Sequence, residues 1–236
     1  MDIFKTILNA PTDYKFLRLK HFNRIVVLAP HCDDEVIGCG GTILRYLSIG
    51  AEVLIIYFTL PQDEKLAVVR KNEAISVWRK NDKVVLDFWS YPDSQLENVR
   101  MDAIDRMIGT IKAFRPEMIL FPWMIDSHED HRNVFYILYE SLKYLDYLCD
   151  IQCYEIFHPL MANYIVNVTD VYANKENMLK QYQSQLRLNI VDSCLYLSRY
   201  RASCINLSAI KHAEAFYVTS SGQLLKRSRD IYTHWV

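Results

Sequence analysis

Short apolar runs alternate with longer segments of helical periodicity along most of the chain, and this alternation limits the possible folds more than any other feature. The runs are short and mostly non-alternating, as in strands buried on both faces. They occupy residues 24–29, 51–59, 84–89, 117–122, 151–157, 164–169 and 213–219. Helices are predicted over 35–50, 64–81, 95–114 and after residue 131. We therefore expect an α/β fold with a Rossmann-like, doubly wound and mostly parallel sheet.

The last third of the chain has a weaker pattern. Residues 170–186 predict a helix with Thr169 or Asp170 as its N-cap, whereas 187–208 predict an irregular segment with one short helix. No internal repeat, low-complexity tract or linker interrupts the sequence. The chain has 236 residues, the length of one α/β domain, so we expect 1–236 to form a single domain.

Composition and charge argue against several classes of function. A net charge of −1 and a charged fraction of 23% favour neither nucleic acid nor an anionic membrane as a partner. The first residues lack the apolar stretch of a signal peptide, and no run of about 18 apolar residues predicts a membrane span. The six cysteines contain no C-x-x-C pair. We therefore expect reduced thiols and a cytoplasmic location.

Two polar clusters follow predicted strands at the point where each strand ends. The sequence HCDDE (31–35) comes after the strand at 24–29, and DSHEDH (126–131) comes after the strand at 117–122. In a common doubly wound order these two strands are neighbours at the topological switch point, where ligands bind beyond the carboxyl ends of strands. We therefore expect the two clusters to face one crevice.

The residue types in these clusters suit metal chemistry. Histidine and carboxylate together match Zn²⁺, which in catalytic sites takes three protein ligands and keeps one position for water. The pKa of such water falls to about 7, and a carboxylate that is not a ligand can take its proton. A divalent cation would also neutralise the repulsion among Asp33, Asp34 and Glu35. The two clusters together therefore predict a metal site.

Each cluster taken alone also has a simpler interpretation. His128 and His131 form an H-x-x-H pair, which is common outside metal sites, and an acidic run suits the N-terminus of a helix. The glycines of GCGG (38–41) suggest a dinucleotide-binding loop. That loop should begin directly after the strand, however, and Gly38 comes nine residues after Ala29. Histidine in both clusters, each at a strand end, favours the metal site.

These motifs resemble the PIG-L/LmbE-like zinc-dependent de-N-acetylase family. Its first signature, [A/P]-H-P-D-D-E with a glycine-rich continuation, stands here as PHCDDEVIGCGGTI, and its second, H-x-D-H, stands as HEDH. Weaker matches are RKNEA (70–74), NVTDVYANKENMLKQYQSQL (167–186) and HAEAF (212–216). The resemblance covers about residues 22–218. It implies an LmbE-like fold and a hydrolase that acts on linear amide C–N bonds.

The resemblance also implies roles for the residues of the two signatures. Zinc, or another divalent ion such as Fe²⁺, would be held by His31, Asp34 and His131. Asp33 would be the general base that takes a proton from the metal-bound water. His128 would stabilise the oxyanion of the tetrahedral intermediate or act as a general acid.

Five further residues have supporting or open roles. Asp130 would assist catalysis by orienting a metal-bound histidine, and Glu35 would hold the turn without binding metal. Arg70 would contact the sugar or belong to a solvated basic face. Asp126 would bind a substrate hydroxyl or cap the next turn. Cys32 replaces the family's proline and is either a buried thiol or a soft additional ligand.

The implied substrate is a small molecule, an N-acetylglucosamine-type amino sugar or its conjugate, with acetate and a free amine as products. One alternative is an amidase of the same fold that acts on another acyl amide or on a thiol conjugate. Another is a catalytically silent Rossmann-like binding protein, which the complete set of polar residues disfavours. A homo-oligomer is compatible with the sequence. The loops after the strands carry no pattern that identifies the substrate.

Overall fold

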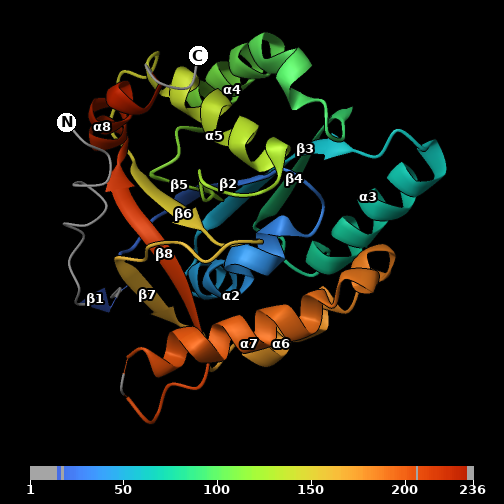
Figure 1. Ribbon diagram of the computed structural model, residues 1–236, viewed down its shortest axis with the longest axis vertical. Coiled ribbons are helices and arrows are strands. Elements are labelled where there is room, and N and C mark those ends of the chain that lie inside the picture. The colour runs from blue at the N-terminus through green and yellow to red at the C-terminus, as the bar shows by residue number, and fades with distance from the viewer. Residues whose placement is uncertain (1–14, 17–18, 206, 233–236) are drawn as a thin grey trace.

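The computed structural model describes residues 15–16, 19–205 and 207–232. The strands within these residues form one eight-stranded sheet in the order β1-β7-β8-β6-β5-β2-β3-β4 (Figure 1). They are β1 (Lys15–Phe16), β2 (Arg24–Ala29), β3 (Glu52–Leu60), β4 (Val84–Pro92), β5 (Met118–Pro122), β6 (Asp150–Tyr154), β7 (Tyr164–Asn167) and β8 (Ala213–Ser220). Neighbouring strands are parallel except that β8 is antiparallel to β6 and β7. The prediction of a mostly parallel α/β sheet is confirmed.

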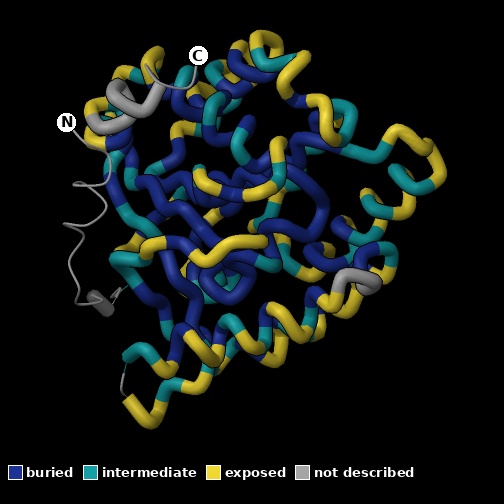
Figure 2. The backbone as a smooth tube through the Cα atoms, viewed as in Figure 1, coloured by how far each residue is buried: buried dark blue, intermediate teal, exposed yellow. Residues whose placement is uncertain are grey.

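Helices cover both faces of the sheet (Figure 1). They are α2 (Asp34–Ser48), α3 (Glu64–Trp78), α4 (Arg100–Phe114), α5 (Glu129–Leu142), α6 (Tyr172–Leu179), α7 (Ile190–Ser203) and α8 (Ser221–Tyr232), with short 3-10 turns η1 (Leu96–Val99) and η2 (Gln183–Leu188). Helices α2, α3, α6 and α7 pack on one face, and α4, α5 and α8 pack on the other. The sheet between them is buried along most of its length (Figure 2). None of the helices in the described ranges combines the length and the apolar run that a membrane crossing needs.

The switch point of the sheet lies between β2 and β5. Residues 25–27 of β2 pair with 118–120 of β5, while β3 pairs with the other edge of β2. The two strands predicted to be neighbours are therefore neighbours, and the segments that follow them emerge side by side. This arrangement places the two polar clusters at the same edge of the sheet.

The C-terminal third differs from the sequence-based expectations. Residues 187–208, expected to be irregular with one short helix, contain the 14-residue helix α7, and α8 was not expected at all. The helix expected at 170–186 is shorter and is preceded by Val171, so neither Thr169 nor Asp170 is its N-cap. The Thr169 hydroxyl instead accepts hydrogen bonds from the backbone N–H groups of Lys211 (2.9 Å) and His212 (3.2 Å). A long-range contact thus occupies the predicted capping group.

Candidate metal centre

The first half of the candidate centre is the tight turn between β2 and α2. Asp33 in this turn has φ 139° and ψ −25°, a conformation that non-glycine residues rarely adopt. Hydrogen bonds within the turn fix it. His31 N donates to Asp34 Oδ2 (2.8 Å), Asp33 N donates to Glu35 Oε2 (3.2 Å) and Val36 N donates to Asp33 O (2.9 Å). These hydrogen bonds therefore hold the strained backbone of Asp33 in place.

Glu35 connects this turn to distant parts of the chain. Its side chain is buried, and Oε1 accepts hydrogen bonds from Tyr57 Oη (2.9 Å), Trp78 Nε1 (3.0 Å) and Tyr182 Oη (2.6 Å). Burial raises the pKa of Glu35, although these three donors oppose the rise. Both carboxylate oxygens have protein partners, so the placement of Glu35 agrees with a role in holding the turn.

The second half of the centre is the loop from β5 to α5. His128 is the N-cap of α5, with an extended backbone (φ −78°, ψ 131°), and its Nδ1 accepts a hydrogen bond from Asp130 N (3.2 Å). Asp126 Oδ1 accepts from His128 N (3.0 Å), and Oδ2 accepts from Phe157 N (3.3 Å). Asp130 and His131 lie in the first turn of α5 and are fully buried. This loop is therefore secured mainly by its own side chains.

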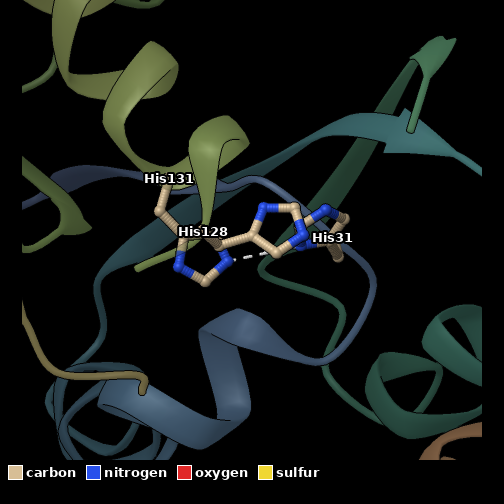
Figure 3. A group of neighbouring side chains, drawn as sticks. All are labelled: His31, His128 and His131. Carbon is tan, nitrogen blue, oxygen red and sulfur yellow. Dashed lines mark hydrogen bonds between the residues drawn. The ribbon is translucent and has the colours of Figure 1, made fainter. Parts of the chain in front are cut away.

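The three predicted metal ligands converge across the crevice. His31 Nδ1 lies 3.0 Å from Asp34 Oδ2, and His131 Nε2 lies 3.4 Å from each of these two atoms. A tetrahedral zinc with bonds of about 2.0 Å separates its ligand atoms by about 3.3 Å. Figure 3 shows the rings of His31, His128 and His131 gathered at this point. The three ligand atoms therefore have the spacing of one face of a zinc tetrahedron.

The second nitrogen of each ligand histidine faces a carboxylate. His31 Nε2 lies 3.2 Å from Asp130 Oδ2, which also accepts a hydrogen bond from Ser94 N (2.7 Å). His131 Nδ1 lies 3.1 Å from Asp126 Oδ1, although the angle between them is not that of a hydrogen bond. Histidines that bind a metal usually have such partners, which orient the ring. The residues present therefore fit a divalent ion.

The charges around this point favour a cation. Burial lowers the pKa of His31, but the carboxylates of Asp130 and Asp34 outweigh burial and raise that pKa well above its usual range. Burial raises the pKa of Asp34, but His131 and His31 outweigh it and hold the pKa well below its usual range. Both pKa shifts arise from the attraction between the imidazole rings and the carboxylates. A bound divalent ion would supply positive charge at the same position.

The pKa of Asp33 is shifted in the opposite direction from that of Asp34. Burial raises the pKa of its carboxyl group well above the usual range, and the neighbouring charge of Asp34 adds to this rise. A carboxylate with a raised pKa beside a metal position is suited to accept a proton near neutral pH. The geometry and the electrostatics of Asp33 therefore agree with the role of general base.

Asp93, which follows β4, is a site residue that the sequence analysis missed. Its Oδ1 lies 3.4 Å from His31 Nε2, and with His31, His128 and Asp130 it forms a second group of potential ligand atoms within 4.8 Å of one another. A further group consists of His31, His128 and His131. We favour the triangle of His31, Asp34 and His131, because its three ligand atoms lie 3.0 to 3.4 Å apart. A partial signal was position, because Asp93 lies four residues after the end of the strand predicted at 84–89, and both polar clusters likewise follow predicted strands.

Three other candidate residues lie beside the centre. Arg70 Nη1 is 4.0 Å from Asp93 Oδ2, and the buried Arg70 Nε has no hydrogen-bond partner among the described residues. The thiol of Cys32 packs in the apolar core, and burial raises its pKa well above the usual range, which argues against a thiolate ligand. Asp126 directs both oxygens to backbone N–H groups, as in the capping alternative.

Comparisons with known proteins identify the family and the fold. Residues 26–142 match the PIG-L family, described as GlcNAc-PI de-N-acetylase. The diacetylchitobiose deacetylase of Thermococcus kodakarensis is 24% identical over 190 residues, covering 69% of this chain and 70% of the relative. The inhibitor-bound N,N′-diacetylchitobiose deacetylase of Pyrococcus horikoshii has a similar structure, with a TM-score of 0.74 and 22% identity over 95% of each chain.

The same fold also occurs in an enzyme of another class. A 4-carboxy-2-hydroxymuconate hydratase from Pseudomonas putida matches 84% of this chain and 95% of its own, with a TM-score of 0.65 and 14% identity. The fold alone therefore does not select the reaction. The match over 26–142 includes both polar clusters, and it confirms the resemblance found in the sequence. The chain carries a PIG-L family domain, related to GlcNAc-PI de-N-acetylase, within the LmbE-like deacetylase fold.

Proposed function

We propose that this protein is a metal-dependent hydrolase that removes the N-acetyl group from an N-acetylated amino sugar or its conjugate. The observation that carries the proposal is the triangle of His31 Nδ1, Asp34 Oδ2 and His131 Nε2, with sides of 3.0 to 3.4 Å, beside the buried carboxyl group of Asp33. The family match and the deacetylase relatives support an N-acetyl amide of an amino sugar as the substrate class. The products would be acetate and a free amine.

His31, Asp34 and His131 would hold zinc, with another divalent ion such as Fe²⁺ as the alternative. When bound, the ion would supply a water of lowered pKa and a polarised substrate carbonyl. Asp33 would take the proton from the attacking water and later return it to the leaving amine. Its raised pKa suits the first transfer, because a carboxylate of raised pKa is a stronger base than an ordinary one.

His128 is suited to stabilise the oxyanion as a neutral donor. Burial, together with the charges of His31 and His131, lowers the pKa of His128, so its ring is neutral at pH 7. Its Nδ1 accepts from Asp130 N, which assigns the ring proton to Nε2. That N–H can donate to the oxygen of the tetrahedral intermediate without a change of protonation. Of the two roles that the resemblance implies for His128, this geometry favours oxyanion stabilisation over general acid.

The remaining candidates divide into substrate contacts and positioning residues. We assign Arg70 and Asp93 to the substrate side, because the buried Arg70 Nε lacks a described partner and Asp93 lies beside His31. We assign Asp130 and Asp126 to the positioning of His31 and His131 respectively. For Asp126 this assignment replaces the expected substrate hydroxyl contact, since its side chain is fully buried.

A release assay tests the proposal directly. The purified protein, loaded with zinc, is incubated with N-acetylglucosamine, N,N′-diacetylchitobiose and N-acetylglucosamine conjugates that carry lipid or thiol groups, and acetate is measured. We expect acetate from at least one substrate, and release by Asp33→Asn that is slower by at least about 10²-fold. Release of a longer acid from another N-acyl amide would favour the amidase alternative. Metal uptake without any hydrolysis would favour the silent binding protein.

A further inference from the structure

Helix α2 is not continuous, and its interruption at Cys39 comes five residues after the candidate ligand Asp34. Cys39 has φ −144° and ψ 17°, which are not helical angles. The interruption separates the first turn of α2, which carries Asp34 and Glu35, from the longer part that packs on the sheet. Sharp bends of this kind arise where a side chain enters the ladder of helix hydrogen bonds. The groups that enter α2 can be identified.

Two charged side chains take the place of helix hydrogen bonds at the interruption. In a continuous helix, Gly41 N would donate to Ile37 O, four residues earlier. Here Gly41 N donates to Glu214 Oε1 (2.8 Å), and Ile37 O accepts from Lys175 Nζ (2.8 Å). Thr42 adds its N–H and its hydroxyl to Glu214 Oε2, at 2.8 and 2.7 Å. Glu214 thus accepts from the backbone N–H groups that the helix leaves free, and Lys175 donates to the free carbonyl of Ile37.

Lys175 and Glu214 also bind each other. Nζ and Oε1 are 2.7 Å apart, and each side chain is only 3% exposed. Burial lowers the pKa of Lys175, but the charge of Glu214 outweighs burial and raises it, so the ammonium group stays charged. The packing is close: a Cβ added at Gly41 would lie 2.8 Å from Val168 and 3.0 Å from Glu214 Oε1. The pair is therefore fitted to the interrupted form of the helix.

We propose that Lys175 and Glu214 are positioning residues for the metal centre, which hold the interruption of α2 and thereby fix the turn that presents Asp33 and Asp34. The link to the turn is short, because Ile37 accepts from Lys175 through its carbonyl and donates to Asp33 O (2.9 Å) through its N–H. A strained residue such as Asp33 persists only when its surroundings over-determine it. The inference takes its metal from the proposed function.

The test compares loss of the pair with loss of an ordinary core contact. Glu214→Gln keeps the size of the side chain but cannot accept all four donors, and Lys175→Met removes the donor to Ile37 O. Ile111→Ala is the matched control, because Ile111 is fully buried in α4 on the opposite face of the sheet. The readouts are zinc affinity, by competition with a chelator, and hydrogen exchange of the backbone amides over 33–42.

We expect Glu214→Gln and Lys175→Met to lower zinc affinity at least tenfold and to raise amide exchange over 33–42. Ile111→Ala should lower the melting temperature while leaving zinc affinity within about twofold. A variant of the pair with unchanged zinc affinity and unchanged exchange over 33–42 would overturn the proposal, as would an equal loss of affinity in the control.

A substitute variant and a second readout cover the cases in which a variant does not fold or the protein binds no zinc. If Glu214→Gln does not fold, Lys175→Arg, which retains the charge with altered geometry, gives the same comparison, and exchange over 33–42 rising more than elsewhere supports the proposal. If the wild-type protein binds no zinc, the proposed function fails, yet exchange over 33–42 still decides whether the pair fixes the turn. Normal zinc binding without deacetylation would likewise refute only the function.

Discussion

The two halves of the candidate metal centre are secured by different means. The turn after β2 contains a residue at φ 139°, and its main support, Glu35, takes hydrogen bonds from Tyr57, Trp78 and Tyr182, which are far away in the sequence. The loop after β5 has ordinary backbone angles at His128, and Asp126, His128 and Arg132 form hydrogen bonds within the loop. Its long-range hydrogen bonds are those from Phe157 N to Asp126 and from the backbone of 94 and 96 to Asp130. The first half depends on tertiary structure, whereas the second depends mainly on local sequence.

This difference suggests how each half should respond to substitution. Supports of the first half are shared with the core, so their loss should lower the free energy of unfolding. Supports of the second half act on single rings, so their loss should affect metal binding or catalysis more than folding. The following substitutions test this division, beginning with the largest expected effect.

The largest effect should come from the two histidines of α5. We expect His131→Ala to abolish stoichiometric zinc binding, because its Nε2 is one corner of the ligand triangle. His128→Ala should keep zinc and lower kcat by about 10²–10³, since one oxyanion donor is lost. Elemental analysis and steady-state kinetics of both variants make the comparison. The reverse pattern would show that the two histidines have exchanged roles.

Asp33→Asn should leave the metal in place and remove the base. The change is isosteric, so the strained backbone and the zinc content should be preserved. We expect kcat to fall by about 10²–10⁴, the usual contribution of general base catalysis. Zinc content per chain and kcat are measured on the same preparation. Turnover near the wild-type value would refute the assignment of Asp33.

Glu35→Gln and Asp126→Asn form a direct contrast between the two halves. An amide at Glu35 turns an N–H group toward Asp33 N or toward the three donors, so we expect a loss of about 1–3 kcal/mol in the free energy of unfolding. Asp126→Asn should weaken zinc binding by about 10–100-fold with a smaller effect on unfolding. Denaturant unfolding and chelator competition measure the two quantities. Equal effects of both substitutions on stability would contradict the division.

The smallest effect concerns the pH dependence of His128. Its pKa is lowered in the folded protein from about 6.5, so the folded state binds fewer protons than the unfolded chain. Its contribution to stability is complete above about pH 6.5 and is lost as pH falls through the lowered pKa. His128→Gln does not titrate, so the metal-free variant should lose less stability than the wild type between pH 7 and pH 5. Parallel curves for the two proteins would contradict a neutral His128.

The fold and the convergence of the two polar clusters could be predicted because their signals are local. Buried parallel strands are continuous apolar runs, and the candidate ligands His31 and His131 come two and nine residues after the ends of two such runs, at 29 and 122. Tyr182 could not be found in this way, and a position after a strand does not by itself single out Asp93. Their importance arises from contacts with His31 and Glu35 across the fold, and no spacing in the sequence records such contacts.

The length of helix α7, which the sequence analysis underestimated, has a related explanation. Its N-cap, Asn189, has left-handed backbone angles (φ 50°, ψ 32°) and forms no side-chain capping bond. Asparagine is a favoured N-cap residue, but here its side chain does not cap the helix, and packing against β8 and α6 stabilises α7 instead. The prediction of Thr169 as an N-cap was wrong for a similar reason. Thr169 is a good capping residue, but its hydroxyl accepts hydrogen bonds from the backbone N–H groups of Lys211 and His212.

The backbone of Asp33 also sets a limit on how this protein can change over evolutionary time. Glycine adopts positive φ without the strain that every other residue meets there. A descendant that abandoned the reaction could therefore gain roughly 1 kcal/mol of stability by replacing Asp33 with glycine. Drift at this position would run toward a more stable and inactive protein, so only selection for turnover keeps an aspartate in a conformation that its own backbone resists.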